Sequence, residues 1–163
     1  KNSSRAEHYF LRALRIYEAN YNDHTKIIGH ILWKLGEIYF AAKRYSEADK
    51  FLEHSLKRYD SIDLNAPPEK ADVLYLLAVL RIEDLKYGEA SEQLRRALQI
   101  YQKTVPDTDP RIATTQNSIF NVRSGFTRQA ILRTKWEWQM PYTGKGWLLT
   151  KLLNIQRQLK SWH

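Results

Sequence analysis

The amino-acid sequence predicts an all-α protein, an α–α superhelix (solenoid) of antiparallel helix hairpins. Three observations predict this class. The sequence matches itself at a shift of 42 residues, the matched segments have the apolar spacing of amphipathic helices, and no segment shows the alternation that is typical of a strand. Because a hairpin of two helices cannot bury its apolar faces alone, we expect successive hairpins to stack along the chain.

The repeat is clearest in three helices that we call the B helices, expected at about 3–21, 45–62 and 87–104. Each has apolar or aromatic residues at offsets 0, 4, 8 and 11 and a small residue at offset 7, which is the stripe of an amphipathic helix. The matching positions are Ala6, Ala48 and Ala90; Phe10, Leu52 and Leu94; Ala13, Ser55 and Ala97; Leu14, Leu56 and Leu98; and Tyr17, Tyr59 and Tyr101.

The helices between them, which we call the A helices, are expected at about 25–43, 68–86 and 110–124. Pro68 and Pro110 lie one repeat apart, and proline suits the first turn of a helix because its missing N–H has no intrahelical acceptor there. Asp109 precedes Pro110, and its carboxylate can accept hydrogen bonds from the free N–H groups. The second and third A helices therefore have defined starting signals.

The small residues of the repeat lie where an A helix and a B helix are expected to touch. One hairpin reads Leu32-x-x-Leu35-Gly36-x-x-Tyr39 followed by Ala48-x-x-x-Leu52, and the next reads Leu74-x-x-Leu77-Ala78 followed by Ala90-x-x-x-Leu94-x-x-Ala97. This pattern, over residues 6 to about 125, resembles the tetratricopeptide repeat. The resemblance implies a tetratricopeptide-like scaffold or adaptor that binds other proteins.

The third A helix and the loop before it narrow this resemblance. Pro106-Asp107-x-Asp109-Pro110 is followed by Ala113-Thr114-Thr115-Gln116-Asn117-Ser118-Ile119, which is similar to the repeats of kinesin light chains. In that family an Asn of the A helix contacts cargo peptide, and Asn117 matches it. Trp33 and Tyr75 occupy the same phase in the other two repeats. The resemblance implies that the protein binds a cargo peptide.

In this architecture the A helices line the concave side, so their outward positions predict a peptide-binding groove. Aromatic side chains there supply contact area, and Asn side chains can hydrogen-bond a peptide backbone. The predicted groove residues are His30, Trp33, Lys34, Glu37, Tyr75, Val79, Asn117, Ser118 and Asn121. The alternative interpretation is that Trp33, Tyr75 and Phe40 are packing residues between neighbouring helices.

The charge of the chain is unevenly distributed. The formal net charge is +8, and residues 126–163 contain seven basic residues and one acidic residue. We therefore divide the chain into a repeat array, residues 1–125, and an atypical basic, Trp-rich segment, residues 126–163. In that segment 128–138 can form a degenerate B helix, and Trp147 to Trp162 predicts an amphipathic helix that caps the array or binds a partner. The alternative function is binding of anionic membrane or nucleic acid through this segment.

Several classes of protein are not expected. The chain has no cysteine, which excludes disulfides, Cys-containing zinc sites and thiol catalysis. The histidines lack ligand spacing, and Gly144-Lys145-Gly146 lacks the approach of a phosphate loop. We therefore expect no enzyme, no metal, no cofactor and no small-molecule substrate. No run of 18 apolar residues occurs, and we expect a cytoplasmic protein. Because the pattern starts with a B helix, we also expect a longer array.

Overall fold

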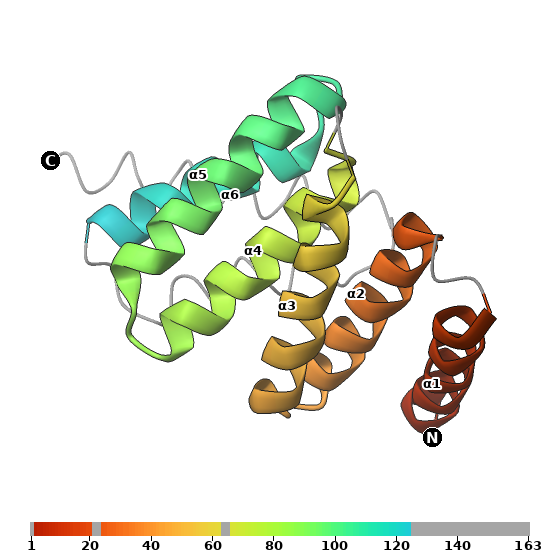
Figure 1. Ribbon diagram of the computed structural model, residues 1–163. Coiled ribbons are helices and arrows are strands. Elements are labelled where there is room, and N and C mark those ends of the chain that lie inside the picture. The colour runs from red at the N-terminus through yellow and green to blue at the C-terminus, as the bar shows by residue number, and fades with distance from the viewer. Residues whose placement is uncertain (1, 21–23, 63–65, 125–163) are drawn as a thin grey trace, which may run out of the picture. The chain divides into compact units, whose positions relative to one another are not determined.

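The computed structural model describes residues 2–20, 24–62 and 66–124, and within these ranges the chain forms six α-helices and no strand (Figure 1). The helices are α1 (Asn2–Asn20), α2 (Thr25–Ala41), α3 (Tyr45–Asp60), α4 (Pro68–Glu83), α5 (Tyr87–Thr104) and α6 (Pro110–Arg123). The all-α prediction is confirmed. The B helices are α1, α3 and α5, and the A helices are α2, α4 and α6.

The signals that start two of the A helices act as expected. Pro68 and Pro110 are the first residues of α4 and α6. The Asp109 carboxylate accepts a hydrogen bond from the backbone N–H of Arg111, with 2.9 Å between nitrogen and oxygen. The predicted N-cap is therefore confirmed. The helices expected at 128–138 and from Trp147 to Trp162 lie outside the described residues, and the division of the chain at residue 125 stays a prediction.

The turns from A helix to B helix have the same backbone geometry in both complete hairpins. Lys43 and Leu85, one repeat apart, have φ angles of 59° and 62°, in the left-handed region that usually holds glycine at a helix C-terminus. The backbone N–H groups of Lys43 and Arg44 donate to carbonyl oxygens of the last turn of α2, and Leu85 and Lys86 do the same for α4. Helices α2 and α4 therefore end without glycine, at a cost in backbone strain.

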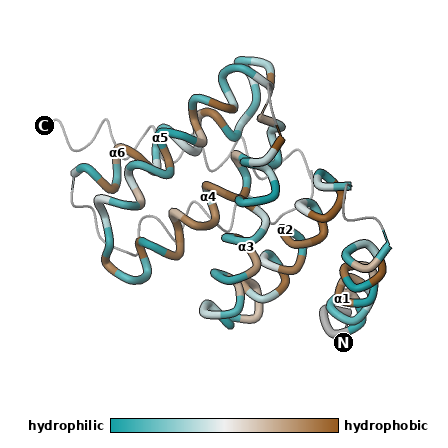
Figure 2. Tube along the Cα trace, in the orientation of Figure 1, coloured by the Kyte–Doolittle hydropathy of each residue, from teal (hydrophilic) through white to brown (hydrophobic). Residues whose placement is uncertain are grey.

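The closest packing occurs within the hairpins α2–α3 and α4–α5, while α1 packs on α2, α3 on α4 and α5 on α6. A methyl group at Gly36 would lie 2.6 Å from Leu52, so only glycine fits there. A methyl group at Gly29 would lie 3.2 Å from the Tyr59 ring. The buried Ser55 hydroxyl donates to the Gly29 carbonyl oxygen at 2.7 Å. Figure 2 shows more brown on α2 and α4 than on α3 and α5, because α2 and α4 contribute more of the core.

Polar contacts join the B helices α1 and α3 to the next A helix at one repeating place. The Tyr39 hydroxyl of α2 donates to Glu7 of α1 at 2.7 Å. One repeat later Arg81 of α4 binds Asp49 of α3 at 2.8 Å, and it also binds Glu53 at 3.0 Å and Glu89 at 3.3 Å. We call these contacts the junction bridges.

The third junction bridge is not formed by the described residues. The next pair in the repeat is Ser91 of α5 and Arg123 of α6. The Ser91 hydroxyl is buried without a hydrogen-bond partner in the described part of the chain, and Arg123 is exposed. Since serine carries no charge, it cannot replace the carboxylates of the first two junctions.

Candidate functional site

The predicted groove residues come from three helices of one kind, the A helices α2, α4 and α6. Helix α2 contacts α4 directly, and α6 packs mainly on α5. Four of the nine residues are on α2, two are on α4 and three are on α6. The structure separates them into side chains at the surface and side chains between helices.

On α2, four predicted residues form one group. The Lys34 ammonium lies 3.7 Å from the centre of the Trp33 ring and 2.8 Å from a Glu37 carboxylate oxygen. The exposed His30 ring meets the edge of Trp33, with ring centres 5.1 Å apart. Cation–π and ion-pair contacts at a partly exposed site stabilise modestly, by about 0.5–1 kcal/mol each, so Lys34 and Glu37 can exchange these contacts for contacts with a ligand.

Trp33 lies beneath this group rather than on the surface. It is 9% exposed and packs in the hydrophobic core. Its indole Nε1 has no hydrogen-bond partner among the described residues, which costs free energy because a buried donor has lost water. Trp33 therefore supports His30 and Lys34 from below.

Tyr75 connects α4 to α6. Its hydroxyl lies 3.2 Å from the Ser118 hydroxyl, and Ser118 itself donates to the Thr114 carbonyl oxygen at 2.9 Å. Because Ser118 has one proton and uses it on Thr114, Tyr75 is the donor in their contact. Ser118 and Val79 are buried, at 1% and 3% exposure. The structure thus places Ser118 and Val79 between helices, with Tyr75 half-buried at their edge.

Asn117 and Asn121 lie one turn apart on α6. Asn117 is exposed and Asn121 is half-buried. Neither side-chain amide makes a hydrogen bond to another described residue, and the backbone carbonyl oxygen of Asn121 accepts a hydrogen bond from the Ser124 hydroxyl. Each amide offers two donors and an acceptor, which suits a peptide backbone.

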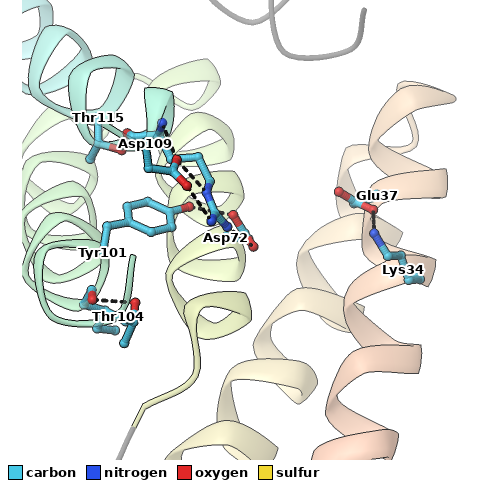
Figure 3. Close-up of polar contacts among 9 residues, drawn as sticks. Lys34, Glu37, Asp72, Tyr101, Thr104, Asp109 and Thr115 are labelled. Atoms are coloured by element: carbon cyan, nitrogen blue, oxygen red, sulfur yellow. Dashed lines mark hydrogen bonds and ion pairs between the residues drawn. The ribbon is translucent and has the colours of Figure 1, made fainter. Parts of the chain in front are cut away.

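A network that the sequence did not indicate lies where α4, α5 and α6 meet (Figure 3). The buried Tyr101 hydroxyl donates to Asp72 at 2.6 Å. Arg111 lies 3.5 Å from the other Asp72 oxygen and 2.9 Å from Asp109. Two features of the sequence were relevant: a Tyr recurs at the position of Tyr101, and Asp72 is at the repeat position of the predicted groove residue His30. Neither feature predicts the distance between the Tyr101 hydroxyl and the Asp72 carboxylate.

The two carboxylates of this network have opposite pKa shifts. Burial raises the pKa of Asp72 to about 6, although the hydrogen bond from Tyr101 and the charge of Arg111 oppose the rise. The hydrogen bond from Arg111 lowers the pKa of Asp109. Arg111 is closer to Asp109, so Asp72 receives too little of its charge to offset burial.

Two surface hollows on the described residues are lined by residues other than those of the predicted groove. A hollow of about 510 Å³ on α6 is lined by Gln116, Ile119, Phe120, Arg123 and Ser124. A hollow of about 300 Å³ is lined by Glu18, Leu32, His54, Lys57 and Arg58. Within the described ranges, no three His, Asp or Glu side chains are placed to hold a metal ion. No helix there is long and apolar enough to cross a membrane.

A family model described as the tetratricopeptide repeat matches residues 1–61 and 28–103. A search of curated proteins returned no match.

Proposed function

The chain belongs to the tetratricopeptide repeat family, and we propose that it is a scaffold that binds an extended or helical segment of a partner protein along α2, α4 and α6. Repeats of this family generally mediate protein–protein interaction. The proposed contact residues are the nine predicted from the sequence, with the exposed ones in direct contact and Trp33, Val79 and Ser118 supporting them from beneath. Binding of a cargo peptide, as in kinesin light chains, and a cytoplasmic location are the finer parts of this proposal.

The observation that carries the proposal is the pair of unpartnered amides on α6. Asn117 and Asn121 make no side-chain hydrogen bond within the described residues, whereas Thr115 and Ser118 on the same helix each donate to a backbone carbonyl oxygen of α6. Two amides at this spacing can hydrogen-bond a peptide backbone. On α2, Lys34 and Glu37 add one charge of each sign.

The test is binding of a peptide selected against the full chain from a random library. We expect Asn117→Ala with Asn121→Ala to weaken this peptide by about tenfold, which corresponds to about 1.4 kcal/mol. Trp33→Ala is unsuitable as a test because Trp33 is core and its loss would unfold the hairpin.

The matched control is Gln99→Ala with Gln102→Ala, which removes two exposed amides from the B helix α5. The control should bind the peptide as the wild type does, and circular dichroism should show that both variants fold. Equal affinity of wild type and the Asn variant would refute the site. A selection that yields no peptide at all would count against the function itself.

A further inference from the structure

The acidic residues of the B helices are used mainly inside the array. Glu7 of α1 binds Tyr39 and Arg44, and Asp49 and Glu53 of α3 bind Arg81. These partners all belong to the next A helix or to the turn that follows it. Three of the six acidic side chains of α1 and α3 are therefore engaged at the junction bridges.

The basic residues of the B helices remain on the outside. Arg12, His54 and Arg96 share one repeat phase on α1, α3 and α5, and Arg15 and Lys57 share another. All five are exposed, and none has an ion pair with another described residue. We call these five residues the basic stripe. Residues 1–125 are nearly balanced in charge, so it is the direction of the acidic side chains that makes this face positive.

The remaining acidic residues of the B helices do little to neutralise the stripe. Glu47 binds Arg44 at 2.9 Å, and Glu89 binds Arg81 at 3.3 Å. Asp60 is paired with Lys70 of α4 at 2.8 Å, and Glu92 lies 3.6 Å from Arg95. Glu18, near the end of α1, has no ion pair within the described residues. It lies at the hollow of about 300 Å³, across from Lys57.

That hollow gives the basic stripe a shape as well as a charge. Its walls are Glu18 of α1 and His54, Lys57 and Arg58 of α3, and Leu32 of α2 also lines it. A partner segment can place a carboxylate beside Lys57 and an apolar side chain towards Leu32. An acidic protein segment can place an uncharged residue beside Glu18, whereas a nucleic-acid strand carries a phosphate at every step and is repelled there.

We propose that the basic stripe on α1, α3 and α5 is a second interaction surface, which takes an acidic segment of a partner protein. This surface is formed by the B helices, whereas the proposed peptide groove is formed by the A helices. The two surfaces can therefore be occupied independently. The stripe also consists of described residues and does not depend on the basic segment 126–163.

The test uses the full chain, labelled with ¹⁵N, and a copolymer of glutamate and tyrosine as the probe. We expect amide resonances of Arg12, His54, Lys57 and Arg96 to shift, and the shifts to diminish with added salt because screening shortens to about 3 Å at 1 M. In the variant Arg12→Glu with Lys57→Glu, the concentration of copolymer that produces the same shifts should be about ten times higher, since each charge reversal replaces attraction by repulsion.

The matched control is Lys26→Glu with Lys86→Glu, which changes the net charge equally at exposed residues outside the stripe. The control should bind as the wild type does. Shifts confined to residues 126–163 or to Asn117 and Asn121 would overturn the proposal, as would equal weakening in both charge variants. A DNA duplex that shifts the stripe resonances where the copolymer does not would overturn it in favour of nucleic acid. None of these results bears on the proposed peptide groove, which is tested separately by the Asn117 and Asn121 variant.

Discussion

The two complete hairpins, α2–α3 and α4–α5, use the same residue phases but differ in their polar contacts. Tyr59 and Tyr101 lie one repeat apart and are both fully buried, at 0% and 1% exposure. The Tyr101 hydroxyl donates to Asp72, while the Tyr59 hydroxyl has no partner among the described residues. The residue equivalent to Asp72 in the first hairpin is His30, which is exposed and meets Trp33. The tyrosine ring thus packs in both hairpins, and one residue of the facing A helix determines whether its hydroxyl is hydrogen-bonded.

The hairpins also differ in how closely their backbones approach. In the first, Gly29 and Gly36 allow Tyr59 and Leu52 against the α2 backbone, and Ser55 bonds Gly29. The second hairpin has Ala71, Ala78 and Ala97 at the equivalent positions of Gly29, Gly36 and Ser55. The first hairpin therefore depends on close approach of two backbones, and the second depends on a charged network. One repeat pattern can thus be stabilised either by close backbone packing or by a charged network.

The largest expected effect tests the charged network of the second hairpin. Because the pKa of Asp72 is raised to about 6 in the folded state, the folded protein binds this proton more tightly than the unfolded chain. The stabilisation is fully present below about pH 4 and is lost as the pH rises through 6. The shift corresponds to about 3 kcal/mol. We expect Asp72→Asn to remove this dependence.

The measurement is urea denaturation of wild type and Asp72→Asn at pH 4 and at pH 7. The difference between the two proteins should change by about 3 kcal/mol between these pH values, with the variant relatively more stable at pH 7. Asp107→Asn, which removes an exposed carboxylate, is the control and should give a nearly constant difference. A constant difference for Asp72→Asn as well would show that the network does not control stability.

The next effect tests the close approach in the first hairpin. Gly36→Ala places a methyl group 2.6 Å from buried Leu52, so we expect a loss of about 2 kcal/mol from overpacking. Gly88→Ala is the control, because a methyl group there meets nothing within 4 Å and Ala favours the helix by about 0.5–1 kcal/mol. Thermal and urea denaturation should therefore give opposite signs. A neutral Gly36→Ala would contradict the packing argument.

The third prediction compares the two tyrosines directly. Tyr101→Phe leaves Asp72 without its 2.6 Å donor, and we expect a loss of about 1–2 kcal/mol. Tyr59→Phe removes a buried hydroxyl that has no partner among the described residues, so its free energy of unfolding should stay the same or rise slightly. The two variants lose the same atom, which makes each the control for the other. Equal destabilisation of both would remove the distinction between the hairpins.

The smallest predicted change in stability concerns the left-handed turn residue that both hairpins share, Lys43 in one and Leu85 in the other. Replacing Leu85 or Lys43 by Gly relieves the left-handed strain of about 1–2 kcal/mol but adds up to about 1 kcal/mol of unfolded-state entropy. We expect each of Leu85→Gly and Lys43→Gly to stabilise by about 0.5–1 kcal/mol, to a similar extent. Denaturation midpoints of the two variants measure this. A gain at one turn and a loss at the other would show that the turns are not equivalent.

Most of the fold could be predicted from the sequence because local signals and the repeat agree. Pro68, Pro110 and Asp109 act over one helical turn, so their role depends little on distant residues. The small residue at Gly36 likewise follows from the repeat, since its partner Leu52 is in the same hairpin. The kinesin light chain resemblance and the concave groove remain proposals.

The burial of individual groove residues could not be predicted in the same way. Helical periodicity indicates the side of α2 or α4 on which a residue lies, but Trp33 and Val79 are at the boundary between the outward side and the neighbouring A helix. The distance between A helices decides whether such a residue is covered, and that distance depends on residues far away in sequence. The contact of Arg111 with Asp72 was missed for the same reason, because it joins residues of two different hairpins.

The described residues form no third junction bridge, and this affects the order in which we expect the array to open. The first turn of α6 is held by ion pairs, because Arg111 binds Asp109 and Asp72. In the last turn, Arg123 is the repeat equivalent of Arg81, but the position of the acidic partner is taken by Ser91. In a linear array each helix depends mainly on its neighbours. We therefore expect α6 to fray from Arg123 towards Pro110, with amide exchange slowest near Ile112. Asn121 would lose its ordered backbone before Asn117, so the two proposed contacts would detach one after the other.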